Sequence, residues 1–231
     1  MNPIDERRDS WNQYWATGAL HSCVGSFEGN YDDEIAHFWR QAFAPLQSTD
    51  RVLDIATGNG ALPQLLLETR SDLSPLPQID AVDLAQIDPA WARLLSPETS
   101  MRLHFHGGVA AEHLPFADGS VDLVVSQYGL EYSELGKSVA ELLRVAKANA
   151  RLALIVHHAD SLPVRLGRAE LLEIDWLCQS GGLLQRTRRL LAYLARLGTP
   201  EGVASVQRDP AAAKARSQYN DCMRDLQQRS V

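Results

Sequence analysis

The central part of the chain alternates between short apolar runs and stretches with helical periodicity. Buried strands are predicted at the apolar runs, which are residues 51–56, 78–83, 102–106, 121–126 and 151–157. Helices are predicted between them, at residues 61–69, 88–95 and about 134–148, the last of these capped by Ser133. Apolar strands of this length that alternate with helices indicate a parallel sheet covered on both faces. The pattern therefore predicts an α/β fold with a doubly wound, mainly parallel sheet.

The pattern changes on either side of this alternating part. Aromatic residues at helical spacing predict two N-terminal helices, at residues 9–20 and 31–44, with a glycine-bearing loop between them. After residue 158 only helices are predicted, at residues 163–179, 183–197 and 210–229. The middle one combines a leucine stripe with arginines, which is typical of a core-facing helix with a solvated basic face. It could also cap an active site or form a dimer face.

Two parts of the chain are expected from this organisation. Residues 1–160 would form a ligand-binding domain that includes the N-terminal helices as a lid. Residues 161–231 would form a helical segment that acts as a cap or as the face of a homodimer.

Composition narrows the environment in which the chain works. The net charge of −7 argues against nucleic acid as a partner, because nucleic-acid binding depends on cationic contacts to phosphate. The three cysteines are odd in number and lack CxxC spacing, which argues against a disulfide framework and a zinc site. His104 and His106 share one face of a strand, and two ligands make a poor metal site, so no metal is predicted. A polar N-terminus and the lack of a long apolar run predict a cytoplasmic protein without a membrane span.

The stretch RVLDIATGNGALPQLLLE at residues 51–68 combines a predicted strand, a glycine turn and a helix. Gly58 and Gly60 allow positive φ and a close approach of the backbone to a ligand. Asp54 lies within the strand, and a buried carboxylate requires hydrogen-bond or charge partners. Pro63 stands where a dinucleotide fingerprint has its third glycine, which weakens the interpretation as a nicotinamide-cofactor site.

Asp83 ends the second predicted strand. Ligands of open parallel sheets bind beyond the carboxyl ends of the strands, where a carboxylate can accept both hydroxyls of a ribose. This residue suits NAD and other adenosine cofactors equally, so it does not distinguish them.

Four motifs stand in order along the central part: LDIATGNG, VDL, AEHLPFADGSVD and LVVSQY. Together they resemble the class I S-adenosylmethionine-dependent methyltransferases, and more narrowly the type 11 or ubiquinone-biosynthesis-like group. The resemblance covers about residues 30–158. It implies a Rossmann-like sheet, here with N-terminal helices and a helical C-terminal extension, with S-adenosylmethionine as cofactor and S-adenosylhomocysteine as product.

The resemblance also implies a role for each matching position. The cofactor contacts would be Asp54, Thr57, Gly58 and Gly60 at the methionine end and ribose; Asp83 at the ribose hydroxyls; Leu84 on the adenine; Ala111 and Glu112 at the adenine edge; and Ser126, Gln127 and Tyr128 near the sulfonium. The family usually has an Asp that binds the adenine amino group where this chain has Ala110. Either a neighbouring carbonyl or Glu112 would supply that contact, or cofactor affinity is reduced.

A cationic sulfonium suits aromatic side chains, and Tyr14 and Tyr31 are the favoured candidates because each carries a hydroxyl and adjoins a loop. Methyl transfer is an in-line displacement in which positioning dominates, and a base is needed only if the acceptor must lose a proton. Glu131, Tyr132, His157 and His158 are candidates for that base, and Glu131 with His157 is the preferred pair.

The leading hypothesis is therefore methyl transfer to a small-molecule acceptor. A nicotinamide-dependent oxidoreductase and a non-catalytic cofactor-binding or partner module are the alternatives. Class I methyltransferases usually complete the sheet with an antiparallel hairpin after the fifth strand, and no such hairpin is predicted here. The chain could be truncated, naturally short, or completed by a partner.

Overall fold

The computed structural model describes residues 3–23, 25 and 27–229. The chain divides into two compact units, Met1–His157 and His158–Val231. The first contains the sheet and the second is helical. No helix in the described residues is long and apolar enough to cross a membrane.

The sheet of the first unit has five parallel strands in the order β3-β2-β1-β4-β5. The strands are β1 (Arg51–Ile55), β2 (Gln78–Asp83), β3 (Leu103–Gly107), β4 (Val121–Gln127) and β5 (Ala146–Ile155). The chain order reverses direction between β1 and β4, which is where ligands bind in doubly wound sheets. The predicted α/β, doubly wound fold is confirmed.

Helices connect the strands of this unit. They are α1 (Pro3–Trp15), α2 (Asp33–Phe43), α3 (Ala61–Thr69), α4 (Pro97–Ser100) and α5 (Leu135–Val145), with two 3₁₀ turns, η1 (Ala90–Leu94) and η2 (Leu130–Tyr132). α1 starts earlier than predicted and ends at Trp15, before Gly18, whose positive φ of 82° is incompatible with a continued helix. The segment predicted as a helix at residues 88–95 is the shorter turn η1.

The N-terminal cap predicted for α5 was wrong. Glu134 is the cap residue, and the Ser133 hydroxyl instead donates to the Leu130 carbonyl at 2.7 Å, which closes η2. α5 also ends at Val145, and β5 follows at once, so the strand begins five residues before its predicted start at residue 151. The early part of β5 pairs Ala146 with Val121 across a register irregularity.

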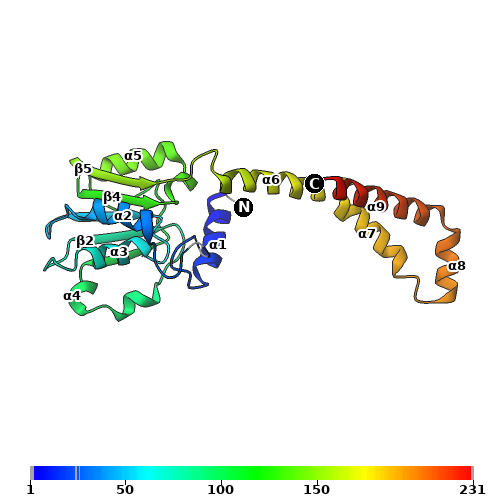
Figure 1. The fold of residues 1–231 in the computed structure, drawn as a ribbon, viewed down its shortest axis with the longest axis horizontal. Helices are drawn as coiled ribbons and strands as arrows, with labels where there is room; N and C mark the ends of the chain where they lie inside the picture. Colours follow the sequence, from blue (N-terminus) through cyan, green and yellow to red (C-terminus); the bar gives the residue numbers. More distant parts are fainter. Residues whose placement is uncertain (1–2, 24, 26, 230–231) are drawn as a thin grey trace. The chain divides into compact units, whose positions relative to one another are not determined.

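Helices cover both faces of the sheet, each over its own apolar cluster. α2 and α3 lie over one face (Figure 1), where Trp39 and Phe43 of α2 pack with Val52 and Val125 of the strands. α5 lies over the other face, against the cluster that includes Leu53. Because strand side chains alternate, neighbouring residues of β1 face different layers, and Asp54 faces the α2 layer.

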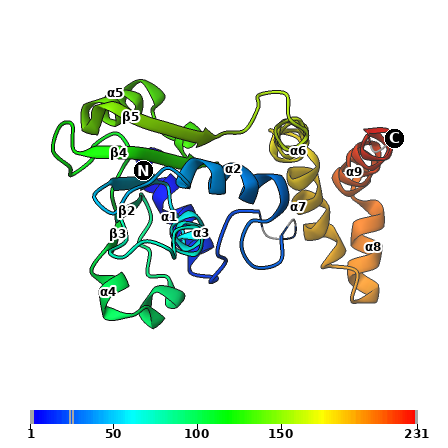
Figure 2. The same cartoon turned by 60° about the vertical axis from the view of Figure 1, so that its left-hand side comes forward.

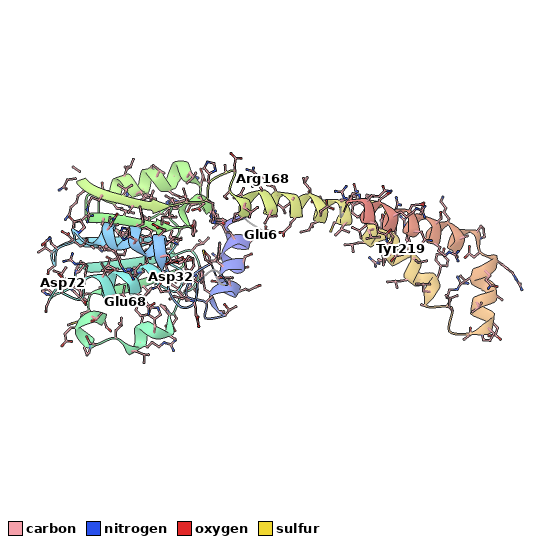
Figure 3. All side chains as sticks on the ribbon, viewed as in Figure 1. Glu6, Asp32, Glu68, Asp72, Arg168 and Tyr219 are labelled. Atoms are coloured by element: carbon pink, nitrogen blue, oxygen red, sulfur yellow. The ribbon has the colours of Figure 1, made fainter. Side chains whose placement is uncertain are left out.

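The carboxyl ends of the strands lie beside α1. In the side-chain view, Glu6 on α1 lies at this edge, and Asp72, in the loop after α3, lies at the opposite edge (Figure 3). Two residues at the carboxyl edge, Ala56 after β1 and Tyr128 after β4, have positive φ values of 56° and 52°. Such conformations are costly outside glycine and concentrate at functional sites, which directs attention to this edge.

The second unit consists of four helices: α6 (Leu162–Cys178), α7 (Leu183–Leu194), α8 (Pro200–Arg208) and α9 (Pro210–Arg229). α7 and α9 pack side by side (Figure 2). α8 is absent from the predicted elements; Pro200 occupies its first turn and the Thr199 hydroxyl caps it by accepting from Gly202 N–H at 3.1 Å. Among the described residues after Ile155 there is no strand.

Candidate active site

A cleft opens at the carboxyl edge of the sheet, with about 830 Å³ of empty space including its mouth. Its walls come from α1 and the loop that follows it, and from the loops after β1, β2, β3 and β4. The charged side chains in the lining are those of Asp54, Asp83, Glu112 and Arg7.

The glycine turn after β1 is built by backbone hydrogen bonds and tight packing. Thr57 N–H donates to the Val82 carbonyl at 3.0 Å, and Gly60 N–H donates to the Thr57 carbonyl at 3.0 Å. Gly58 and Gly60 have φ values of 55° and 84°, and a methyl group on Gly58 would lie 2.5 Å from the Trp15 ring. Both the backbone conformation and the space at this turn therefore require glycine.

Asp83, at the end of β2, braces this turn. Its Oδ2 accepts from Gly58 N–H and its Oδ1 from Ala85 N–H, both at 2.8 Å. Burial raises the pKa of Asp83, and these two backbone donors partly offset the increase. The carboxylate also faces the cleft, so it can accept further hydrogen bonds from a ligand while it holds β1 and β2 in register.

Asp54 is a buried carboxylate in the wall of the cleft. Its side chain is buried and faces the cavity, yet neither carboxylate oxygen has a hydrogen-bond partner among the described residues. Burial raises the pKa of Asp54 to about 8; the nearby Thr57 hydroxyl lowers it and the charge of Asp83 raises it further. A buried, unpaired carboxylate is unstable in its charged form, so this site is suited to a cationic ligand group.

Hydrogen bonds to the strand-end loops hold the helix α1 over the cleft. Asn59, after β1, donates to the carbonyls of Trp15 and Ala19 at 3.0 and 2.7 Å. After β2, Gln86 N–H donates to Asn12 Oδ1 at 2.7 Å. These contacts hold the C-terminal half of α1 against β1 and β2.

Arg7 fastens the other end of α1. It contacts Glu112 Oε1, after β3, at 3.4 Å and donates to the Tyr132 carbonyl after β4. Burial alone would raise the pKa of Glu112, but the Glu134 backbone N–H and Arg7 outweigh it and hold that pKa below its usual range. The helix is thus tethered to the loop after each of the strands β1 to β4, and it forms a lid.

One face of α1 carries the residues that reach the cleft. Arg7, Trp11 and Trp15 are spaced by four positions, so they lie on the same face of the helix. The two indoles stack with centroids 5.6 Å apart, and Trp11 also meets Tyr132 edge-on at 5.8 Å. Tyr14 lies on a neighbouring face and donates from its hydroxyl to the His21 carbonyl at 3.2 Å.

His21 and Tyr31 form a second aromatic wall. Their rings stack at 4.5 Å, and Phe27 meets both edge-on. The His21 Nδ1 accepts from Cys23 N–H at 3.2 Å, and burial lowers the pKa of the imidazole, with backbone carbonyls partly opposing the decrease. Burial therefore favours the neutral form of His21 in the wall of the cleft. Burial also raises the pKa of Tyr31.

The end of β4 supplies the floor through Gln127 and Tyr128. Gln127 Oε1 accepts from the indole N–H of Trp39, which is fully buried. Ser126 points the other way: it is fully buried, and its hydroxyl donates to the Ile55 carbonyl at 2.8 Å. Ser126 therefore braces β4 against β1 behind the floor.

Glu131 and His157 lie next to each other at the rim. Glu131 Oε1 is 2.8 Å from His157 Nδ1 and also accepts from His157 N–H at 3.0 Å. The imidazole stacks on Tyr128 with centroids 4.4 Å apart and meets Tyr132 edge-on. Tyr128 and Tyr132 line the cleft, whereas Glu131 and His157 lie behind them.

The structure brings most of the sequence-predicted residues together. The cleft is lined by Tyr31, Asp54, Thr57, Asp83, Leu84, Ala111, Glu112, Gln127 and Tyr128. The predicted residues outside the lining are Tyr14, Gly58, Gly60, Ser126, Glu131 and His157. Their roles in ligand binding or catalysis stay predictions. Within the described residues, no cluster of three or more His, Cys, Asp or Glu side chains could hold a metal ion.

Sequence reasoning missed Arg7 and His21 as lining residues. Arg7 stands four positions before Trp11, and this spacing could have revealed it. His21 lies in a loop without periodicity, so no pattern in the sequence marks it.

Comparison with known proteins identifies the central part of the chain. The model of the methyltransferase domain family matches residues 53–154. YcgJ, an uncharacterized methyltransferase of Bacillus subtilis (strain 168), is 32% identical over 127 residues, which cover 52% of this chain and 46% of that protein. The chain thus spans about half the length of this curated relative.

Solved structures show the same fold. The geranyl diphosphate C-methyltransferase from Streptomyces coelicolor A3(2), in complex with Mg²⁺, geranyl diphosphate and S-adenosylhomocysteine, has a TM-score of 0.51 at 16% identity, over 74% of this chain and 73% of that one. A geranyl diphosphate methyltransferase with sinefungin has a TM-score of 0.52 at 16% identity, over 71% and 74%. Residues 53–154 of the chain are thus similar to the methyltransferase domain family, and the chain shares its fold with solved methyltransferases.

Proposed function

We propose that the protein transfers a methyl group from S-adenosylmethionine to a small-molecule acceptor in the cleft at the carboxyl edge of the sheet. The observation that carries the proposal is Asp54: a buried carboxylate that faces the cleft with both oxygens unpartnered among the described residues. Such a group suits a ligand that brings a positive charge, and S-adenosylmethionine carries two, on its ammonium and its sulfonium.

The residues present fit the parts of this cofactor. Asp83 can accept the ribose hydroxyls, because its two backbone donors leave lone pairs on both oxygens. Leu84, Val109 and Ala111 provide apolar walls for an adenine ring. The cofactor supplies a methyl group already activated on sulfur, so the chain's task is to orient the two reactants and exclude water.

The charge of the cleft bears on the alternative functions. Among the described residues that line it, Arg7 is the one Lys or Arg, and it is engaged by Glu112. A pyrophosphate would therefore lack a free cationic partner, which counts against a nicotinamide dinucleotide. The same argument counts against a diphosphate acceptor of the kind that geranyl diphosphate methyltransferases bind.

Enclosure supports a small acceptor. α1 covers the cleft and is tethered to four loops, so a reactant must fit beneath it. Where the acceptor must lose a proton, we propose that Glu131 and His157 receive it by relay through Tyr128 or Tyr132, which stand between this pair and the cleft. The contact of 2.8 Å between Glu131 and His157 supports this role, because a carboxylate that holds an imidazole fixes the orientation of a base.

The second unit supports the prediction of a homodimer. α6 has no buried residue, and it exposes the large apolar side chains Leu162, Leu166, Leu171, Leu172 and Ile174. Analytical ultracentrifugation of the full chain tests this, and a monomer at high micromolar concentration contradicts it. The predicted cytoplasmic location stays a prediction.

The decisive experiment is calorimetric titration of the purified chain with S-adenosylmethionine, S-adenosylhomocysteine and NAD. We expect micromolar affinity for the first two and none for NAD. Asp83→Asn is the more informative variant, because it keeps one acceptor oxygen for the backbone N–H of Gly58 or Ala85, whereas Asp83→Ala removes both acceptors. Failure to bind either adenosyl compound contradicts the proposal. Methyl transfer is then tested with labelled cofactor and fractionated metabolites; tight binding without transfer favours a non-catalytic module.

A further inference from the structure

The side-chain amide of Gln127 has a fixed orientation at the floor of the cleft. Trp39 is fully buried and its indole N–H can only donate, so the amide oxygen must face Trp39 and the NH₂ group must face away from it. The Gln127 Nε2 is buried and has no hydrogen-bond partner among the described residues, although Gln127 lines the cleft. A buried donor without a partner is unfavourable, which points to a ligand oxygen as its partner.

The register of the sheet relates this donor to Asp54. Asp54 of β1 pairs with Val125 of β4, and Gln127 lies two residues further toward the carboxyl edge. The Cα atoms of Asp54 and Gln127 are thus separated by one strand spacing across the sheet and by two residues along the strand, which corresponds to about 8 Å. Both side chains lie on the face of the sheet that α2 covers, as the contact of Gln127 with Trp39 shows.

This arrangement sets an acceptor pair and a donor pair side by side in one buried space. Asp54 offers two unpartnered carboxylate oxygens, and the Gln127 amide offers N–H groups. The ammonium and carboxylate of an α-amino acid are separated by two bonds, so one such group can bridge these two side chains. Arg7, the cation of the lining, is engaged by Glu112 and is placed at the other end of the lid.

We propose that Gln127 binds the carboxylate of the cofactor's amino-acid end while Asp54 binds its ammonium, and that Trp39 is a positioning residue that fixes the Gln127 amide for this task. This rests on the proposed function. Trp39 lies in α2, outside the part of the chain that the methyltransferase family model matches, so this recognition joins the family domain to the N-terminal helices.

The test compares two ligands that differ only in the amino-acid end. S-adenosylhomocysteine carries it, whereas 5′-methylthioadenosine has the same nucleoside and sulfur without it. Their affinities are measured by calorimetry for the wild type, for Gln127→Met, which keeps length without polarity, and for Trp39→Phe, which keeps the aromatic packing without the N–H. Thermal melting of each ligand-free variant verifies that it folds.

We expect Gln127→Met to lower the affinity for S-adenosylhomocysteine by about 10- to 100-fold, which is the effect of one hydrogen bond to a charged group. The affinity for 5′-methylthioadenosine should stay within about twofold of the wild-type value. Trp39→Phe should lower the affinity for S-adenosylhomocysteine alone, and by a smaller factor than Gln127→Met does, because the Gln127 amide can then rotate. Equal loss for both ligands indicates a structural role and overturns the proposal.

Three other outcomes also decide the matter. Unchanged S-adenosylhomocysteine affinity in Gln127→Met overturns the proposal, and an accompanying rise in KM for a methyl acceptor would assign the amide to that molecule instead. If the wild type binds neither ligand, the proposed function itself has failed. If the wild type binds both with equal affinity, the amino-acid end is not recognised, and only the inference about Gln127 is overturned.

Discussion

Replacing Asp54 by Asn should stabilise the ligand-free protein while it destroys ligand binding. The carboxyl is buried and unpartnered among the described residues, and its pKa is raised to about 8 from an ordinary value of 3.8. Between these two values the folded state holds a proton that the unfolded state has released, so stability falls as the pH rises through this window. Asn has the same shape and no proton to lose, so the variant is free of this loss.

The magnitude follows from the two pKa values. One pKa unit corresponds to about 1.4 kcal/mol, so the advantage of Asp54→Asn is about 2 kcal/mol at pH 5 and about 4 kcal/mol at pH 7, and it levels off above pH 8. Urea unfolding of the full chain at pH 5, 6 and 7, followed by tryptophan fluorescence, measures it. Thr57→Ser, a conservative change beside Asp54, serves as the matched control and should show no such pH dependence relative to the wild type.

Asp54→Asn should be more stable than the wild type, but it should bind the ligand more weakly. A cationic ligand group requires the charged form of Asp54, so binding to the wild type at pH 7 should release close to one proton, and affinity should rise with pH up to about 8. Calorimetry in buffers of different ionisation enthalpy measures this release, which Asp54→Asn should abolish together with most of the affinity. The reasoning is refuted if the stability difference between the variant and the wild type is the same at pH 5 and pH 7, or if the variant is the less stable protein at pH 7.

Three further predictions concern the lid and the rim. Asn59→Ala removes two hydrogen bonds to the end of the lid and should cost about 1–3 kcal/mol of stability and speed release of S-adenosylhomocysteine several-fold in stopped-flow tryptophan fluorescence; an unchanged release rate would count against the lid. Gly58→Ala should cost about 1–3 kcal/mol in urea unfolding, and Trp15→Ala should recover part of this loss, whereas additive effects of the two changes would contradict their contact. Glu131→Gln should slow methyl transfer by about 100-fold or more and leave S-adenosylhomocysteine affinity within about twofold; a matching loss of affinity would indicate that the pair with His157 is structural.

The sheet could be predicted because each strand carries its own local signal. An apolar run of five or six residues indicates a buried parallel strand wherever its partners are. The five strands, the position of Asp54 within β1 and that of Asp83 at the end of β2 could therefore be predicted from the sequence. Helix ends were less predictable. The cap of α5 depends on whether Ser133 turns toward α5 or toward the Leu130 carbonyl, and only the packed structure decides that.

Contacts between distant segments could not be predicted. Asn59 is a turn residue by its sequence context, and its bond to Trp15 spans 44 positions along the chain. The contact of Gln127 with Trp39 spans 88 positions and joins two segments that each look like ordinary core. Neither contact produces a periodic pattern in the sequence. The residues of the cleft floor could therefore be predicted from the sequence, whereas the orientation of their polar groups could be seen only in the folded structure.

The tethers of α1 have a consequence for the rate at which the protein can work. The helix is held at several points, so we expect it to leave the cleft only when these contacts break nearly together. If the protein turns over a bound cofactor as proposed, we expect the exchange of product for fresh cofactor to wait for this opening, so that the opening rate would limit turnover. The tethered helix comprises residues 3–15, which lie outside the part of the chain that the methyltransferase domain model matches. We therefore expect substitutions in these residues to change the rate of turnover without any change in the groups that perform the reaction.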